Sequence, residues 1–178
     1  INLSTLMLEM EPVKNLRMRF GTSFRTLKSA LPDAFSLDYL DPDAPGGISS
    51  QIRQFDLITT LVYTPGKRTI GYGVERRDIN DDYSTLLLNY THGVRGFLES
   101  DFDYRKIQFS YTQPWQLGGL GRLTTSVEVG KTFGSVPLGL LNVVPGNQTF
   151  FTIFNSFPNL DYYEVVTDTY TSMHLEHN

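Results

Sequence analysis

The clearest pattern in the sequence is a two-residue alternation of apolar and polar side chains. The stretch LRMRFGTSFR, residues 16–25, carries apolar side chains at alternate positions and places Arg17, Arg19 and Arg25 between them. Successive side chains of a β-strand point to opposite faces, so this stretch predicts a strand with one apolar face and one face that bears arginine. Such a strand suits a soluble sandwich, where the apolar face packs on a core, or a transmembrane barrel, where it faces lipid.

The same period recurs along the chain, with turn-forming residues between the segments. A helical period is hard to find, so the sequence predicts an all-β antiparallel fold with about eight strands. The predicted strands cover roughly residues 3–10, 16–25, 52–63, 69–77, 83–91, 104–112, 122–133 and 162–176.

The predicted strands are long for a soluble protein. Soluble strands average about five or six residues, whereas a tilted strand that crosses a bilayer needs about nine to eleven. We therefore interpret residues 1–178 as part of a larger transmembrane antiparallel β-barrel. Residues 26–51 contain three prolines and a glycine pair and predict a long loop. This loop should lie outside the membrane, because hydrocarbon cannot host irregular backbone.

Charged side chains on the polar faces would line the lumen of such a barrel. They carry both signs, so they can pair with each other while they stay hydrated. The lipid-facing residues of the first such strand would be Leu16, Met18, Phe20 and Phe24. The predicted lumen-facing charges are Arg17, Arg19, Arg25, Glu75, Arg77, Arg122, Glu128, Glu164 and Asp168.

Composition narrows the classes of function. Aromatic residues make up 13% of the chain, which is typical of strands, and the net charge of -4 supplies no basic surface for nucleic acid. The chain has no cysteine, which excludes disulfides, thiolate metal sites and cysteine nucleophiles. The longest apolar run, around residues 138–144, is too short to cross a bilayer as a helix.

Candidate catalytic and metal-binding groups are few. His174 and His177 would point to opposite faces of a strand, which does not suit a metal site. The GYG at residues 71–73 lacks the strand, loop and helix context of a phosphate-binding loop, and no serine stands in a nucleophile-elbow motif. We therefore expect a non-enzymatic protein with no cofactor and no metal.

The second half of the chain carries an ordered series of motifs. It contains a Gly-x-x-Phe-Gly strand end, Val-Pro and Leu-Leu pairs, a Pro-Gly-Asn turn and a strand that ends in Leu-Glu-His. With these motifs the chain resembles the barrel region of a family of Bacteroidota outer-membrane proteins of unknown function. The matching residues are Gly130, Phe133, Gly134, Val136, Pro137, Leu140, Leu141, Pro145, Gly146, Asn147, Phe150, Asn159, Tyr162 or Tyr163, Glu164, Asp168, Tyr170, Leu175, Glu176 and His177.

The resemblance implies a carboxypeptidase-regulatory-like β domain ahead of a barrel related to the Omp85 surface-antigen superfamily. The stretch Val94, Arg95, Gly96 and Phe97 is similar to the Arg-Gly-aromatic motif that Omp85 barrels carry on a loop folded into the lumen. A simple connection between two strands is the alternative interpretation of this stretch. The chain begins without methionine and ends within a predicted strand, so we expect the barrel to extend beyond both ends.

These observations lead to three hypotheses about function. By resemblance, the protein is an Omp85-like outer-membrane barrel that assembles or translocates outer-membrane proteins, with lipid and other outer-membrane or periplasmic proteins as partners. The second hypothesis is a nutrient-uptake barrel of the TonB-dependent type, in which loops such as 26–51 bind the ligand. The third is a soluble β-sandwich that binds a ligand or serves as a structural module. The first two place the protein in the bacterial outer membrane.

Overall fold

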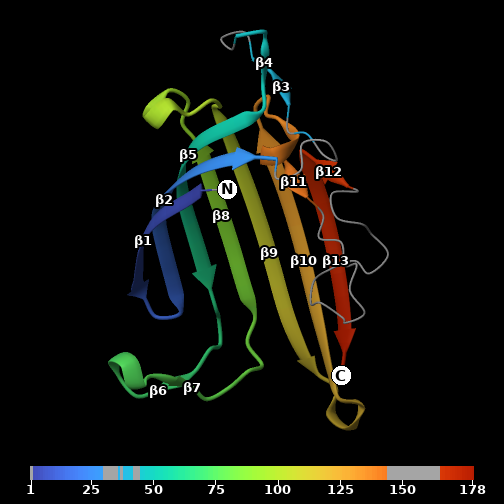
Figure 1. Ribbon diagram of the computed structural model, residues 1–178. Coiled ribbons are helices and arrows are strands. Elements are labelled where there is room, and N and C mark those ends of the chain that lie inside the picture. The colour runs from blue at the N-terminus through green and yellow to red at the C-terminus, as the bar shows by residue number, and fades with distance from the viewer. Residues whose placement is uncertain (1, 30–35, 37, 42–44, 144–164) are drawn as a thin grey trace.

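A single antiparallel sheet of seven strands dominates the structure, a computed structural model that describes residues 2–29, 36, 38–41, 45–143 and 165–178 (Figure 1). Each long strand pairs with the next long strand in the chain, so the sheet is a simple meander. The strands are β1 (Asn2–Val13), β2 (Leu16–Lys28), β5 (Gln51–Tyr63), β8 (Thr85–Gly93), β9 (Tyr104–Gln116), β10 (Arg122–Phe133) and β13 (Thr169–His177).

Short elements lie at the two ends of the sheet (Figure 1). We call the end where β2 finishes and β5 begins the upper end, and the end with the tight β1–β2 turn the lower end. Among the described residues, no helix is long and apolar enough to cross a membrane. The short elements are β3 (Tyr39–Leu40), β4 (Ile48–Ser49), β6 (Thr69–Ile70), η1 (Gly73–Glu75), β7 (Arg77–Asp78), η2 (Phe97–Glu99), η3 (Gly118–Leu120), η4 (Leu138–Leu140), β11 (Asn142–Val143) and β12 (Val166–Thr167).

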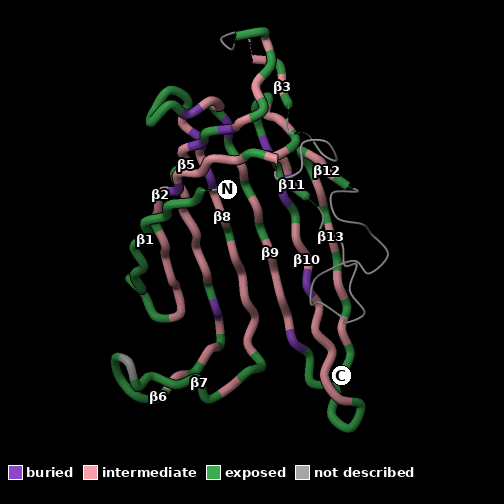
Figure 2. The backbone as a smooth tube through the Cα atoms, in the orientation of Figure 1, coloured by how far each residue is buried: buried purple, intermediate pink, exposed green. Residues whose placement is uncertain are grey.

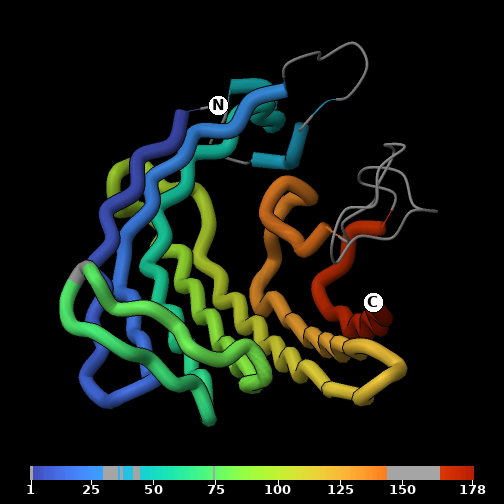
Figure 3. The backbone as a smooth tube through the Cα atoms, turned by 90° about the horizontal axis from the view of Figure 1, so that it is seen from below, coloured from blue at the N-terminus to red at the C-terminus, as the bar shows by residue number. Residues whose placement is uncertain are grey.

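The sheet is strongly curved, and Figure 3 shows its strands following an arc. Residues 134–143, which we call the inner segment, lie inside this arc on the concave side (Figure 3). Strands β1 and β13 are the two edges, so the described sheet is open and is not closed into a barrel. The prediction of an antiparallel all-β fold is therefore confirmed at the level of the sheet.

Cross-strand register gives the sheet one polar and one apolar face. One row that crosses all seven strands is polar, apart from a glycine. The adjacent row, offset by one residue, is almost wholly apolar and points to the opposite face. The polar row is Glu9, Arg19, Thr60, Asn89, Gln108, Gly130 and Tyr170. The apolar row is Met10, Met18, Leu61, Leu88, Phe109, Val129 and Thr171.

The polar row lies on the concave face. A cavity between strands β9, β10 and β13 and the inner segment is lined by Gln108 and Tyr170 of that row. The main buried apolar cluster also lies on this side, at the upper end, and consists of Ile52, Tyr104 and Leu140. Figure 2 shows buried residues mainly near this end of the sheet. The concave side is thus where strands and loops pack together.

Two glycines make room for tyrosine rings on the concave face. Gly130 is the direct cross-strand partner of Tyr170, and Gly93 is the partner of Tyr104. A Cβ atom added to either glycine would overlap its partner's ring. Bending a sheet crowds the side chains on its inner face, and glycine beneath an aromatic ring relieves that crowding.

Several observed strands differ from the predicted ones by a few residues at their ends, and three differences are larger. The prediction of a strand over 69–77 is wrong, because Gly71 (φ +88°) and Gly73 (φ +58°) turn the backbone out of the extended region between β6 and β7. The predicted loop 26–51 loses residues 26–28 to β2 and contains the short β3 and β4. The predicted last strand, 162–176, begins at Thr169 as a long strand, and residues 162–164 lie outside the described residues.

We expect Gly130→Ala to lower the free energy of unfolding by about 1–3 kcal/mol, because the Tyr170 ring must move to admit the new methyl group. Gly119→Ala is the matched control, since a Cβ at Gly119 meets nothing within 4 Å. Equilibrium unfolding in urea measures both. Equal stability of the two variants would show that the ring does not need the glycine.

Candidate functional site

The concave face carries a chain of hydrogen bonds that runs across the sheet. Thr60 Oγ1 donates to Asn89 Oδ1 (2.8 Å), and Asn89 Nδ2 donates to Gln108 Oε1 (3.3 Å). Gln108 Nε2 then passes over Gly130 and donates to the Tyr170 hydroxyl (3.1 Å). The first two steps join neighbouring positions of the polar row and the third skips only the glycine, so the register that forms the sheet also builds this surface.

The hydroxyl of Tyr170 ends the chain at a carboxylate, because it donates to Glu128 on β10. The three inner members, Asn89, Gln108 and Tyr170, thereby each accept one hydrogen bond and donate another within the face. A surface of amide and hydroxyl groups held in this way stays polar without a net charge of its own.

A buried ionic cluster lies on the same face, closer to the upper end than these hydrogen-bonded side chains. Arg25 Nη2 lies 3.0 Å from Asp56 Oδ2, and the side chain of Asp56 is only 3% exposed. The hydroxyl of Tyr104 donates to Asp56 Oδ1 (2.9 Å) and accepts from Arg25 Nη2 (2.9 Å). The three side chains come from β2, β5 and β9, so the cluster ties separate strands together on the concave face.

The inner segment is bound beside this cluster. Lys106 Nζ on β9 donates to the carbonyl oxygen of Leu140 (3.0 Å). Asn142 Nδ2 donates to Thr132 Oγ1 on β10 (3.2 Å). The cavity that remains between the segment and the sheet has a volume of about 490 Å³.

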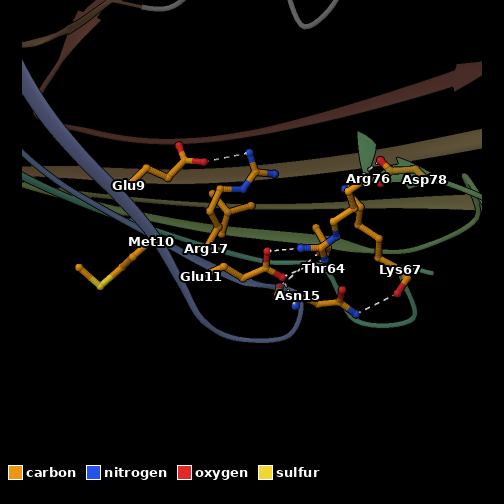
Figure 4. Close-up of a pocket in the computed structure, with 10 residues that line it drawn as sticks. Glu9, Met10, Glu11, Asn15, Arg17, Thr64, Lys67, Arg76 and Asp78 are labelled. Atoms are coloured by element: carbon orange, nitrogen blue, oxygen red, sulfur yellow. Dashed lines mark hydrogen bonds and ion pairs between the residues drawn. The ribbon is translucent and has the colours of Figure 1, made fainter. Parts of the chain in front are cut away.

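A second cavity, of about 310 Å³, opens at the lower end between β1, β2 and the connection from β5 to β8 (Figure 4). Both Nη atoms of Arg76 bind the Glu11 carboxylate, at 2.5 and 3.0 Å. This carboxylate raises the pKa of Arg76 above its usual value. Lys67 Nζ lies 2.8 Å from Asp78 Oδ2 within the same connection. The Arg76–Glu11 pair thus fastens the β5–β8 connection to edge strand β1, and the Lys67–Asp78 pair joins two parts of the connection itself.

Most of the charges predicted to line a lumen share the concave face. The register places Arg17, Arg19, Arg25, Arg122 and Glu128 at positions of that face. Arg19 pairs with the cross-strand Glu9, and Arg122 Nη1 lies 2.7 Å from Asp81 Oδ2 in the β5–β8 connection.

The remaining predicted charges lie elsewhere. Glu75 is part of η1 and Arg77 part of β7, so both belong to the β5–β8 connection and not to a long strand. Asp168 directly precedes β13, and its carbonyl oxygen accepts from the Thr132 backbone N–H (2.7 Å). Glu164 lies outside the described residues.

The Val94–Phe97 stretch forms part of the connection between β8 and β9. The backbone N–H of Val94 donates to the carbonyl of Phe55 (3.0 Å), and the Phe97 ring stands 4.6 Å from the Phe55 ring. The register places Phe55 on the convex face, opposite its partner Phe24. Phe97 therefore packs on the convex side of the sheet, whereas Arg95 lines a separate cavity at the upper end.

Sequence reasoning missed the uncharged members of the concave face and several of its charged ones, among them Glu9, Asp56 and Lys106. Asn89, Gln108 and Asp56 each stand between two apolar neighbours, so the period that identified the arginines could have found them. Lys106 follows Arg105, so the alternation is weaker there. In the part of the chain that is described, no group of three or more His, Asp or Glu side chains is placed to hold a metal ion.

Fold and faces together define an all-β protein built on one curved antiparallel sheet, with a hydrogen-bonded polar concave face and an apolar convex face. Residues 41–178 match the family model described as "Family of unknown function (DUF5686) C-terminal domain", and the chain belongs to this family. Comparisons with curated proteins and with solved structures gave no match.

We expect Asp56→Asn to cost about 3 kcal/mol of stability, because it leaves the Arg25 guanidinium beside a buried position without its counter-charge. Glu99→Gln is the control, since Glu99 pairs with Arg53 at an exposed position and its loss should cost less than about 1 kcal/mol. Urea unfolding followed by the fluorescence of Trp115 compares the two. A larger loss for Glu99→Gln would contradict the role given to the cluster.

Proposed function

We propose that the sheet is part of the wall of a transmembrane β-barrel in the bacterial outer membrane. Its convex face would contact lipid, and its concave face would line a hydrated lumen. The observation that carries this proposal is the pair of adjacent rows, polar and apolar, that both run across all seven strands. A bilayer-spanning barrel requires this alternation on every strand.

Exposure of the convex face supports lipid over water as its neighbour. Leu88, Phe109 and Val129 of the apolar row are 37–39% exposed, although they are central in the sheet. Among the described residues, the fully buried apolar side chains lie on the concave side instead. A soluble sandwich would bury its apolar face under a second layer, and a bare apolar face of this extent marks contact with a partner or a membrane.

The directions of the edge strands determine how many further strands could close the sheet into a barrel. Seven antiparallel strands leave β1 and β13 running in the same direction, so these edges cannot pair with each other in the antiparallel manner. An odd number of further strands between them would complete an antiparallel ring. We assign these strands to the same polypeptide outside residues 1–178, because every unpaired backbone group of an open edge costs several kcal/mol in lipid.

The proposed role of the complete barrel is non-enzymatic assembly or translocation of outer-membrane proteins, as in the Omp85 superfamily. Sequence resemblance to the Bacteroidota barrel family supports this role. Its partners would be membrane lipid and other outer-membrane or periplasmic proteins. The packing of Phe97 on Phe55 differs from a loop folded into the lumen, so the Omp85 kinship rests on the C-terminal motifs and not on Arg95.

Two neighbouring residues in the middle of β9 test the orientation of the wall. Phe109→Arg should cost about 2–4 kcal/mol of folding free energy in a bilayer, because it places a charge in hydrocarbon. Ser110→Arg is the matched control and should cost far less, since Ser110 lines the cavity on the polar concave face. The fraction of full-length protein folded into lipid vesicles, scored by heat-modifiable migration on gels, measures both.

Equal effects of the two substitutions would contradict the orientation. The solubility of the chain provides a second test: residues 1–178 in detergent-free buffer should aggregate, because the apolar face and both edges are open. A monodisperse monomer with cooperative unfolding would overturn the membrane proposal and support the soluble sandwich.

A further inference from the structure

We propose that the inner segment is a plug docked on the polar face, which must leave that face before hydrophilic solutes can pass along it. This inference rests on the proposed barrel, because only a closed wall turns the concave face into a passage. The inner segment would be the element of this chain that keeps the passage narrow.

An apolar anchor seats the segment at the upper end. Leu140 is 1% exposed and packs with Ile52 of β5 and Tyr104 of β9. Val136, from the start of the segment, packs against the same cluster. Leu138 belongs to the same short turn as Leu140 but is 58% exposed. Leu140 thus anchors the segment to the sheet, whereas Leu138 is exposed.

Polar contacts complete the docking of the segment, and they come from the wall strands β9 and β10 and from Asp168, which directly precedes β13. Lys106 on β9 holds the Leu140 carbonyl, and Thr132 on β10 holds the Asn142 amide, which also donates to the carbonyl of Asp168 (3.4 Å). The receptor for the segment is therefore the concave face itself. In Figure 3 the segment projects into the space that the arc of strands encloses.

The segment roofs the polar face and does not fill it. Leu141, Asn142 and Val143 form one side of the cavity of about 490 Å³, and side chains of β9, β10 and β13 form the other. The floor includes Gln108 and Tyr170 of the hydrogen-bonded chain. Removal of the roof would join this polar cavity to the lumen without breaking any strand pair of the main sheet.

Backbone geometry makes the segment separable from the wall. At Gly134 (φ +110°) the chain leaves β10 through a left-handed conformation that turns it inward. Among the described residues, the segment forms regular strand pairs at two positions, Asn142 with Thr167 and Val143 with Val166. Neighbouring wall strands pair over eight or more residues each, so local opening of the segment should precede any opening of the wall.

Leu140→Ser tests the plug, with Leu138→Ser as the matched control on the same turn. Both are made in full-length protein that also carries Ser126→Cys. Ser126 is buried and lines the cavity, and residues 1–178 contain no other cysteine. After reconstitution in planar bilayers and vesicles, we expect Leu140→Ser to raise both the conductance in potassium chloride and the labelling rate by a membrane-impermeant thiol reagent. A rise on the order of tenfold corresponds to a modest shift of the docked population. Leu138→Ser should match the parent in both.

The outcomes separate the plug from the barrel. If the parent inserts and migrates in a heat-modifiable manner but Leu140→Ser matches Leu138→Ser, the plug is overturned and the barrel stands. If the parent does not insert, the barrel is overturned. Should Leu140→Ser itself not fold, Asn142→Ala with the same two readouts takes its place, because it removes only the hydrogen bonds to Thr132 and Asp168. Unchanged conductance and labelling in that variant would likewise overturn the plug.

Discussion

Backbone hydrogen bonding between strands fixes the chemistry of both faces at once. The polar and apolar rows differ by one residue on every strand, so a slip of one position in any pairing would move its side chains to the wrong face. The ladder from β2 to β5 alone aligns thirteen positions, from Leu16 with Tyr63 to Lys28 with Gln51. Because each pair is set in this way, a hydrogen-bonded chain of side chains can cross several strands and still meet its partners.

Curvature depends on the same register. Gly93 and Gly130 face Tyr104 and Tyr170 directly across their ladders, so the bulky ring and the empty position meet only when the pairing is correct. The hydroxyl groups of both rings also donate hydrogen bonds within the polar surface, Tyr104 to Asp56 and Tyr170 to Glu128. The placement of tyrosine opposite glycine therefore contributes to both the shape and the polarity of the concave side.

Local alternation in the sequence was enough to predict most of the sheet. Residues 122–133 were predicted as a strand and coincide with β10, and the arginines of 16–25 share one face as expected. The 69–77 prediction failed because Gly71 and Gly73 take left-handed conformations that residue type alone permits but does not require. The Asp56–Tyr104 contact joins positions 48 apart, and it depends on the pairing of three strands and on the curvature, neither of which periodicity contains.

The attachment of edge strand β1 has a mechanical consequence. Within the described sheet β1 pairs with β2 alone, and the register between them breaks between Met10 and Val13, near the lower end. At that same end Glu11 grips Arg76 and the Asn15 backbone N–H. The lower end of β1 therefore has contacts beyond its pairing with β2, through Glu11. Under mechanical load or heat, β1 should separate from β2 first at Asn2. Exchange of its amide hydrogens should then become slower from Asn2 toward Glu11.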